Sequence, residues 1–354
     1  MSNLTKSLTD FSELEQQALL ALKQQVSKVF VTGAGGFLGY AICERLNAAG
    51  IETVGFARNQ YSSLTDLGIN SVQGDIANLQ QVTDAMQGCD LVFHVASKAG
   101  VWGSKQSYFS PNVDGASNII NACQALGIKS LVYTSTPSVT FSGEDENGID
   151  ESAPYAHTFL NHYGESKARA EKMMLNANSA SLKVTALRPH LIWGPNDPHL
   201  VPRVIERAKA GKLKLVGKQD KLVDTIFIDN AAYAHILAAV DLTQTAKSAG
   251  KAYFLSNDQP ITMAQMLNKI LACVDLPPVN KRVPAKLAYG VGVLLETIYG
   301  ALNKQQEPIM TRFVAKQLST SHYFNISAAK QDLGYQPIVS IDDGMEKLAQ
   351  YLAK

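Results

Sequence analysis

Short apolar, β-branched runs alternate with amphipathic segments along the first half of this chain. Six runs have the length and continuous apolar character of buried parallel strands. They are residues 29–32, 53–57, 70–72, 91–96, 131–135 and 183–187. Between them, apolar residues recur at helical spacing, as at Ile42 and Leu46. Strands separated by helices are joined by right-handed crossovers, so the pattern predicts an α/β fold with a doubly wound (Rossmann) parallel sheet.

The pattern changes after about residue 190, where helical periodicity dominates and prolines become frequent. These prolines are Pro189, Pro195, Pro198, Pro202, Pro277, Pro278, Pro284 and Pro308. No flexible linker separates the two parts, so we expect them to be interleaved. The prediction is a dinucleotide-binding domain over 28–190, with return segments near 224–256. A smaller, mostly helical C-terminal substrate-binding cap would take up most of 191–354.

The first 27 residues contain no apolar run of the kind found in signal peptides. Residues 11–25 instead have the periodicity of an amphipathic helix. We therefore expect an N-terminal helical extension over 1–27 and a cytoplasmic protein. The four cysteines are scattered without redox or metal-binding spacing, as expected for free thiols in a reducing compartment.

One segment of the second half is unusually apolar. Residues 287–298 carry a single charge, Glu296, and Lys286 and Lys304 flank them. The segment is too short to span a bilayer. Three interpretations of 285–304 stay open: a helix that covers a substrate cleft, peripheral contact with a membrane or lipid-like substrate, or contact with another enzyme of the same pathway.

Charge is almost balanced over the 354 residues, with 32 basic and 31 acidic side chains and a net charge of +1. Nothing in this balance indicates a nucleic-acid partner. The histidines at 94, 157, 162 and 199 do not have metal-ligand spacing, and no cysteine cluster exists, so we expect no metal site.

A glycine-rich turn follows the first predicted strand. Gly33, Gly36 and Gly39 form a G-x-x-G-x-x-G pattern. The first glycine allows a tight turn, the second lets the backbone approach a pyrophosphate, and the third lets the helix pack on the strand. The helix N-terminus, with Phe37 and Leu38, would then face the phosphates with free N–H groups. This arrangement predicts dinucleotide binding.

The end of the second strand indicates which dinucleotide binds. NAD enzymes usually carry a carboxylate there, but this strand ends in Arg58. An arginine can pair bidentately with a 2′-phosphate, so we expect NADP(H). Asp75, followed by Ile76 after the third strand, would meet the adenine amino group or else cap a helix.

Tyr163 and Lys167 are four residues apart, on one face of a predicted helix. A ketone that accepts hydride also needs a proton, and a nearby ammonium makes a phenol a better acid. The fifth strand ends at Ser135 and Thr136, where parallel sheets bind their ligands. We expect the Thr136 hydroxyl, with Ser135 as the second choice, to bond the substrate carbonyl.

Together these motifs resemble the extended short-chain dehydrogenases from about residue 28 to the C-terminus. The resemblance also rests on Asn112, on the run Arg188-Pro-His-Leu-Ile-Trp-Gly-Pro195 and on Leu333-Gly-Tyr-Gln-Pro337. The signature from Arg188 to Pro202, with Asn230 and His235 downstream, is most similar to the 3β-hydroxysteroid and sterol-4-carboxylate dehydrogenase branch. Residues 97–103 resemble a bacterial group of that branch, which reduces 2-alkyl-3-oxoalkanoates in long-chain olefin biosynthesis.

The resemblance implies roles for individual residues. Tyr163 would donate the proton, with Lys167 as its activator, and Thr136 would replace the usual serine of the family. Asn112 would hold the active-site helix and a water. Ala96, Pro189 and His190 would lie along the cofactor. A homodimer through the helix that bears Tyr163 is also implied.

The substrate expected from this group is a long-chain 2-alkyl-3-oxo acid, a lipid-like small molecule whose β-keto group becomes a hydroxyl. Trp102 and Trp193 are expected near the cleft, and Lys98 and His190 near the carboxylate. The first alternative is a 3β-hydroxysteroid or sterol dehydrogenase, which uses the same residues for oxidation.

Two further alternatives are less favoured. A nucleotide-sugar epimerase or dehydratase would typically carry asparagine at the position of Leu191. A non-catalytic NADP-binding regulator would have no need of the tyrosine, lysine and hydroxyl that this chain retains.

Overall fold

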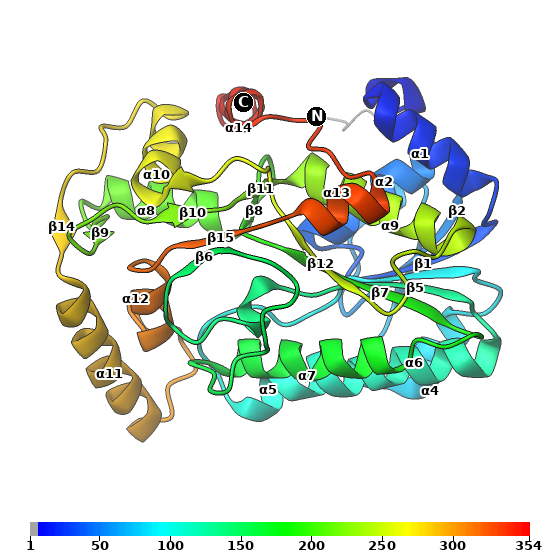
Figure 1. Ribbon diagram of the computed structural model, residues 1–354, viewed down its shortest axis with the longest axis horizontal. Coiled ribbons are helices and arrows are strands. Elements are labelled where there is room, and N and C mark those ends of the chain that lie inside the picture. The colour runs from blue at the N-terminus through cyan, green and yellow to red at the C-terminus, as the bar shows by residue number, and fades with distance from the viewer. Residues whose placement is uncertain (1–5) are drawn as a thin grey trace.

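The computed structural model describes residues 6–354, and a seven-stranded parallel sheet forms its centre (Figure 1). The strand order is β12-β7-β5-β4-β1-β2-β3. The strands are β1 (Lys28–Thr32), β2 (Glu52–Ala57), β3 (Asn70–Gln73), β4 (Leu91–His94), β5 (Ser130–Thr134), β7 (Lys183–Pro189) and β12 (Ala252–Leu255). All neighbouring pairs are parallel. The predicted doubly wound sheet is therefore confirmed.

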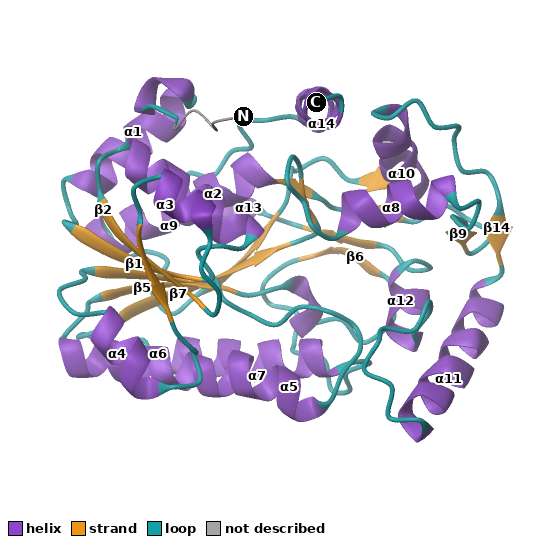
Figure 2. Ribbon diagram, turned by 180° about the vertical axis from the view of Figure 1, so that it is seen from behind, coloured by secondary structure: helices purple, strands orange, loops and turns teal. Residues whose placement is uncertain are grey.

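Helices cover both faces of this sheet (Figure 2). One face carries α1 (Glu13–Lys23), α2 (Phe37–Ala48), α3 (Ser62–Asp66), α9 (Ile228–Gln244) and α13 (Ser327–Leu333). The other carries α4 (Leu79–Ala85), α5 (Lys105–Phe109), a π-helical turn at Ser110–Asp114, α6 (Gly115–Leu126) and α7 (His162–Asn176). Because helices shield both faces, most residues of the other six strands are buried, whereas the edge strand β3 is partly exposed.

Two of the predicted strands end earlier than expected. The run 91–96 stops being a strand at His94, because the N–H groups of Val95 and Ala96 both donate to the Thr32 hydroxyl at 3.0 Å. The chain thus turns across the end of β1. The run 131–135 ends at Thr134. The seventh strand, β12, was not predicted as a strand; it lies within the return segment expected near 224–256 and pairs with β7 at the edge of the sheet.

The remaining elements form a smaller, mostly helical region beside the carboxyl ends of the strands. Its helices are α8 (Leu200–Lys209), α10 (Met263–Ala272), α11 (Ala285–Ala301), α12 (Arg312–Gln317) and α14 (Ile341–Leu352). A small sheet contains β6 (Glu146–Ile149), β10 (Leu222–Val223), β13 (Ile261–Thr262) and β15 (His322–Phe324). Two short pairs join β8 (Ile192–Trp193) to β11 (Ile226–Phe227) and β9 (Leu215–Val216) to β14 (Arg282–Val283). None of the described helices is long and apolar enough to cross a bilayer.

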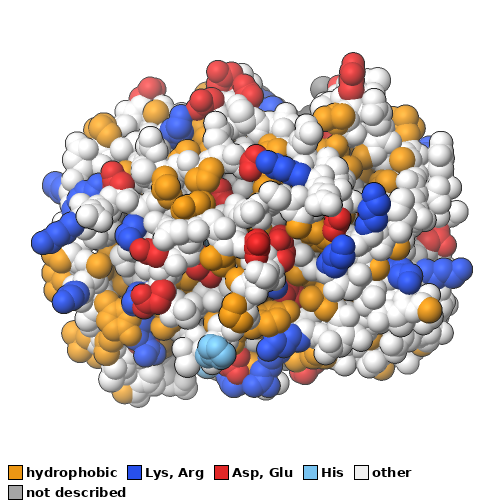
Figure 3. Space-filling model, viewed as in Figure 1, with side chains coloured by type: hydrophobic (Ala, Val, Ile, Leu, Met, Phe, Trp, Pro, Cys, Tyr) orange, Lys and Arg blue, Asp and Glu red, His pale blue; other side chains and the backbone are white. Residues whose placement is uncertain are grey.

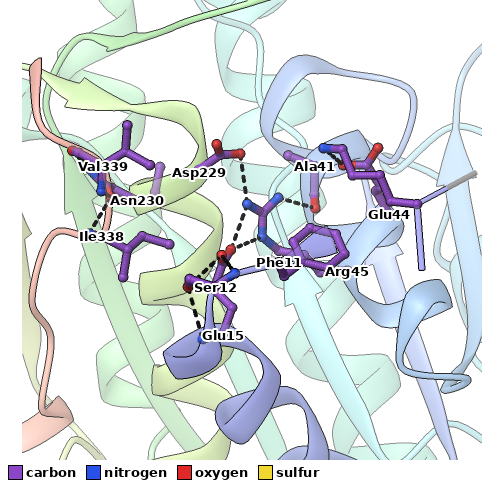
Figure 4. A network of polar contacts seen from close by, with 12 residues as sticks. Phe11, Ser12, Glu15, Ala41, Glu44, Arg45, Asp229, Asn230, Ile338 and Val339 are labelled. Carbon is purple, nitrogen blue, oxygen red and sulfur yellow. Dashed lines mark hydrogen bonds and ion pairs between the residues drawn. The ribbon is translucent and has the colours of Figure 1, made fainter. Parts of the chain in front are cut away.

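The N-terminal helix is attached to the dinucleotide-binding part by a buried ion network (Figure 4). Arg45 of α2, 1% exposed, donates to Glu15 of α1 at 2.9 Å and to Asp229 of α9 at 2.8 Å. A third bond reaches the backbone carbonyl of Ala41 at 3.0 Å. Leu19 and Leu22 of α1 are fully buried in the core, whereas Leu14 and Leu20 are exposed. The helix expected at 11–25 is therefore part of the folded unit.

Candidate active site

A cleft of about 550 Å³ lies at the carboxyl ends of the strands. It is next to the neighbouring strands β1 and β4, whose following connections run to opposite halves of the sheet. It brings together most of the residues singled out from the sequence. Those lining it are Gly33, Gly36, Phe37, Leu38, Gly39, Arg58, Ile76, Ala96, Lys98, Ser135, Thr136, Tyr163, Pro189 and His190. Asp75, Asn112, Lys167, Trp102 and Trp193 are outside this lining.

The glycine turn at one end of the cleft has no room for side chains. Gly33 has φ +66°, and a Cβ there would lie 2.9 Å from the Cα of Ala96. A Cβ on Gly39 would lie 2.2 Å from the carbonyl oxygen of Gly33. Gly36 precedes α2 as its N-cap, so the first N–H groups of the helix are free for an anion. This cradle fits the pyrophosphate of a dinucleotide.

Arg58 lies exposed at the end of β2, at the rim of the same cleft. No carboxylate within residues 6–354 forms a salt bridge with its guanidinium, which is therefore available to a phosphate. Asp75 accepts a bond from the N–H of Ala77 at 3.0 Å, and Asn78, not Asp75, caps α4. The capping alternative for Asp75 is therefore wrong.

Tyr163 is in the first turn of α7, whose N-cap is Asn161. Burial raises the pKa of Tyr163 to about 12, although the Thr136 hydroxyl beside it acts in the opposite direction. Thr136 also accepts from the N–H of Ser138 at 3.2 Å. The buried Ser135 Oγ has no hydrogen-bond partner within the described chain and lines the cleft. Tyr163, Ser135 and Thr136 thus all line the cleft, and the Thr136 hydroxyl lies beside the Tyr163 phenol.

Lys167 lies one helical turn after Tyr163 and is 1% exposed. Its Nζ donates to the carbonyl oxygen of Thr134 at 2.6 Å and lies 4.2 Å from the centre of the Tyr133 ring. Burial lowers the pKa of Lys167 to about 7, with Glu171 opposing that shift. The end of β5 therefore fixes the ammonium position, although Lys167 itself does not line the cleft.

Asn112 connects the helix that bears Tyr163 to the loop after β4. Its side-chain amide donates to Ser166 Oγ at 2.9 Å and to the carbonyl oxygen of Lys98 at 3.1 Å, and its oxygen accepts from the N–H of Lys98 at 2.7 Å. Ser166 in turn donates to the carbonyl oxygen of Tyr163 at 2.9 Å. Asn112 is 2% exposed, so it acts on the cleft through these neighbours.

His190 lines the cleft, but its ring is not suited to bind a carboxylate. Its Nδ1 donates to the backbone carbonyl of Asp224 at 2.7 Å. Burial lowers the pKa of His190 well below its usual value, so the ring is neutral and its other nitrogen is an acceptor. Of the two residues expected near the carboxylate, only Lys98 can supply a positive charge.

Neither tryptophan lines the cleft. Trp193 is fully buried, donates to Thr225 Oγ1 at 3.2 Å and packs edge-on against Phe227. The backbone of Gly344 in α14 approaches this ring so closely that a Cβ there would be 2.8 Å from it. Trp193 is therefore a core residue, and its expected place near the substrate is corrected. Trp102 instead contacts α11, through the ring of Tyr299 and a 2.9 Å bond to the carbonyl oxygen of Lys304.

The sequence reasoning missed several residues that line the cleft. Tyr61 lies against the glycine turn, since a Cβ on Gly35 would be 2.1 Å from its ring. Phe313 and Gln317 of α12 close the far side of the cleft. No sequence signal could have found the α12 residues, because they are almost 300 positions from the glycine turn and belong to no motif.

Comparison with known proteins agrees with this geometry. The sequence pattern of the 3-beta hydroxysteroid dehydrogenase/isomerase family matches residues 30–283. A 2-alkyl-3-oxoalkanoate reductase from Shewanella oneidensis is 69% identical over 94% of this chain and 88% of its own length. One from Stenotrophomonas maltophilia is 47% identical over 91% of this chain and 98% of its own. Among solved structures, an epimerase from Methanothermobacter thermautotrophicus superimposes with a TM-score of 0.75 at 17% identity, covering 96% of each chain. At that identity the likeness shows the fold alone.

Proposed function

The chain belongs to the 3-beta hydroxysteroid dehydrogenase/isomerase family of nicotinamide-dependent oxidoreductases, and on that basis we propose that it is an NADPH-dependent 2-alkyl-3-oxoalkanoate reductase. The observation that carries the substrate is the 69% identity to the Shewanella reductase over 94% of this chain. Relatives this similar over nearly their whole length usually share a reaction. The cleft supports the reaction type, because the phenol of Tyr163 and the hydroxyl residues Ser135 and Thr136 line it. The buried Lys167 follows Tyr163 by one helical turn.

The reaction that we propose converts the β-ketone to a secondary alcohol. A nicotinamide held in the cleft would supply the hydride that forms the new C–H bond at the carbonyl carbon. Tyr163 gives its phenolic proton to the carbonyl oxygen as the C=O double bond becomes a single bond. The Thr136 hydroxyl, which lies beside Tyr163, would donate a hydrogen bond to that oxygen, with the unpartnered Ser135 hydroxyl as the second choice. The tyrosine then regains its proton from solvent.

Lys167 makes the tyrosine a usable acid. Burial raises the pKa of Tyr163 to about 12 and lowers that of Lys167 to about 7, so neither group is easily charged alone. A tyrosinate would favour the ammonium form of Lys167, and the ammonium would favour the tyrosinate. The pair can hold the charge separation that follows proton transfer to the substrate.

Arg58 supports the choice of NADPH over NADH. Its guanidinium is exposed at the end of the second strand, without an acidic partner among residues 6–354. A 2′-phosphate there would receive charge-assisted hydrogen bonds, whereas the 2′-hydroxyl of NADH would offer no charge.

For the carboxylate of the substrate we propose Lys98 alone. Its Nζ lies 4.8 Å from the centre of the Tyr108 ring, and the side chain lines the cleft. As in the sequence interpretation, we propose a homodimer through α7, the helix that bears Tyr163.

The experiment that tests the proposal compares two cofactors and two substrates. Absorbance of the reduced nicotinamide would be followed with NADPH or NADH, on a freshly prepared racemic 2-alkyl-3-oxo acid and on a 3-ketosteroid. The proposal expects rapid oxidation of NADPH by the branched β-keto acid. Turnover of the steroid alone would overturn the proposed substrate, and turnover with NADH alone would overturn the proposed cofactor.

A further inference from the structure

The outer face of α11 is the main apolar surface of the described chain. Twelve large hydrophobic side chains are exposed among residues 6–354, and seven of them lie between residues 287 and 309. These seven are Leu287, Val291, Val293, Leu294, Ile298, Leu302 and Ile309. Five recur at intervals of three or four residues, from Leu287 to Leu302, and so form a single stripe along the helix. We call this surface the α11 stripe.

The opposite face of α11 packs against α12. Ala288 and Gly292 are buried there, and a Cβ on Gly292 would lie 2.7 Å from the backbone of Thr311. Glu296 accepts bonds from the backbone and side chain of Arg312, both at 2.6 Å. This close packing fixes the rotation of α11, so the stripe must point away from the protein. Figure 3 shows apolar side chains gathered at the lower left, where Figure 1 places α11.

The stripe is not the lining of the substrate cleft. In the part of the chain that the structure describes, the cleft residues from this region are Phe313 and Gln317 of α12, and none is from α11. The interpretation of 285–304 as a cleft cover is therefore wrong. The C-terminal end of α11 nevertheless meets the cleft rim, because Lys304 accepts a bond from Trp102 and the cleft includes the neighbouring Val101.

Positive charge surrounds the stripe. Residues 281–312 contain five basic and two acidic residues, in a chain whose net charge is +1, and one of the five, Arg282, pairs with Asp220 outside this segment. Both acids are paired: Glu296 with Arg312 at 2.6 Å and Glu307 with Arg203 at 3.0 Å. Lys286 and Lys304, at the two ends of α11, have no acidic partner among the described residues. An aliphatic stripe between unpaired lysines is complementary to a bilayer with anionic headgroups.

We propose that α11 lies in the surface of an anionic lipid bilayer, with its stripe in the acyl boundary and its lysines among the headgroups. The helix has 17 residues, about 26 Å at 1.5 Å per residue, so it is shorter than the hydrocarbon core and would lie flat. A protein partner suits this surface less well, because protein interfaces are enriched in aromatic residues and arginine and depleted of lysine. The inference rests on this surface and not on the substrate proposed above.

Vesicle flotation of the full-length protein tests the proposal. Vesicles of phosphatidylcholine with phosphatidylglycerol would be compared with vesicles of phosphatidylcholine alone, each at low and high salt. The expected result is flotation with the anionic vesicles that weakens as salt increases. Because the test needs no turnover, a wrong substrate assignment would leave its result unchanged.

Two variants and one control locate the contact. Leu287, Leu294 and Leu302 are the most exposed of the five stripe residues from Leu287 to Leu302, at 57%, 58% and 60%, so replacing all three by serine should leave the fold intact. This triple variant should lose binding at least about tenfold, and K286E/K304E should bind anionic vesicles no better than neutral ones. L14S/L20S, which changes two leucines on α1 that are each 47% exposed, is the matched control and should float like the wild type.

Three results would overturn the proposal. One is the absence of flotation with either vesicle, and another is unchanged flotation of the triple variant. The third is self-association of the wild type through the stripe. In that case the triple variant would have a lower mass in solution than the wild type, and vesicles would bind neither protein.

Discussion

Replacing Arg45 by methionine should destabilise the protein strongly, although this residue does not line the cleft. Arg45 joins α1, α2 and α9, and α2 begins at the glycine turn that faces the cofactor (Figure 4). Methionine preserves much of the side-chain volume but removes the charge and all three hydrogen bonds. Glu15, which is 4% exposed, then keeps a buried carboxylate without its cation.

The size of the effect can be worked from the partners. Burial would raise the pKa of Asp229, but Arg45 and Lys347 outweigh it and hold the pKa at about 2, below the usual 3.8. A shift of this size corresponds to roughly 2 kcal/mol of stabilisation of the folded state. This stabilisation is fully present above pH 3.8 and is lost as pH falls through about 2. With Glu15 also left unpaired, we expect R45M to lower the free energy of unfolding by about 3–5 kcal/mol.

Urea unfolding followed by circular dichroism measures this loss. The matched control is E44Q on the same helix, since Glu44 pairs with Lys6 at 2.8 Å near the surface and should contribute at most about 1 kcal/mol. E15Q/R45M should recover part of the loss, because a neutral amide replaces the unpaired carboxylate. An R45M protein as stable as E44Q, or a double variant less stable than R45M, would refute the reasoning.

R58A should raise the KM for NADPH about 10- to 100-fold, because a charge-assisted pair is lost, and should leave the KM for NADH unchanged. Equal effects on both cofactors in steady-state kinetics would contradict the Arg58 assignment. W193A should lower the free energy of unfolding in urea by about 3–5 kcal/mol and leave the dependence of rate on acyl chain length unchanged. A shifted chain-length optimum would show that Trp193 contacts the substrate. Burial raises the pKa of Asp224 from 3.8 to about 7, so the unfolded chain releases this proton first and the free energy of unfolding falls as pH rises between those values. D224N should remove up to about 4 kcal/mol of this decrease in the free energy of unfolding. If the variant keeps the wild-type pH dependence in unfolding curves, Asp224 is not the cause of the decrease.

The sequence was sufficient to predict the sheet and the glycine turn because their signals are local. Continuous apolar runs give buried strands, and three glycines at fixed spacing are required where the backbone approaches too closely for a Cβ. Tyr163 and Lys167 could also be chosen, since four residues place them on the same side of one helix. The hydroxyls at 135 and 136 followed from their position at the end of a buried strand.

What the sequence could not predict depends on contacts between distant segments. Trp193 is in a core position because Phe227 and α14, which lies about 150 residues away, enclose it. His190 is neutral and turned toward the Asp224 carbonyl, a partner 34 residues further along the chain. The apolar segment at 287–298 left three interpretations open, a cleft cover among them, and only its packing on α12 shows that the apolar side faces outward.

The central claim is that Tyr163 is the proton donor for NADPH-dependent reduction of a 2-alkyl-3-oxo acid. The most direct test is the rate of NADPH oxidation by this substrate with the wild type and with Y163F, alongside the affinity of each protein for NADPH. The claim predicts that Y163F loses about 100-fold or more in kcat while binding NADPH normally. A loss of tenfold or less in kcat, or a wild type that does not oxidise NADPH with this substrate, would contradict it.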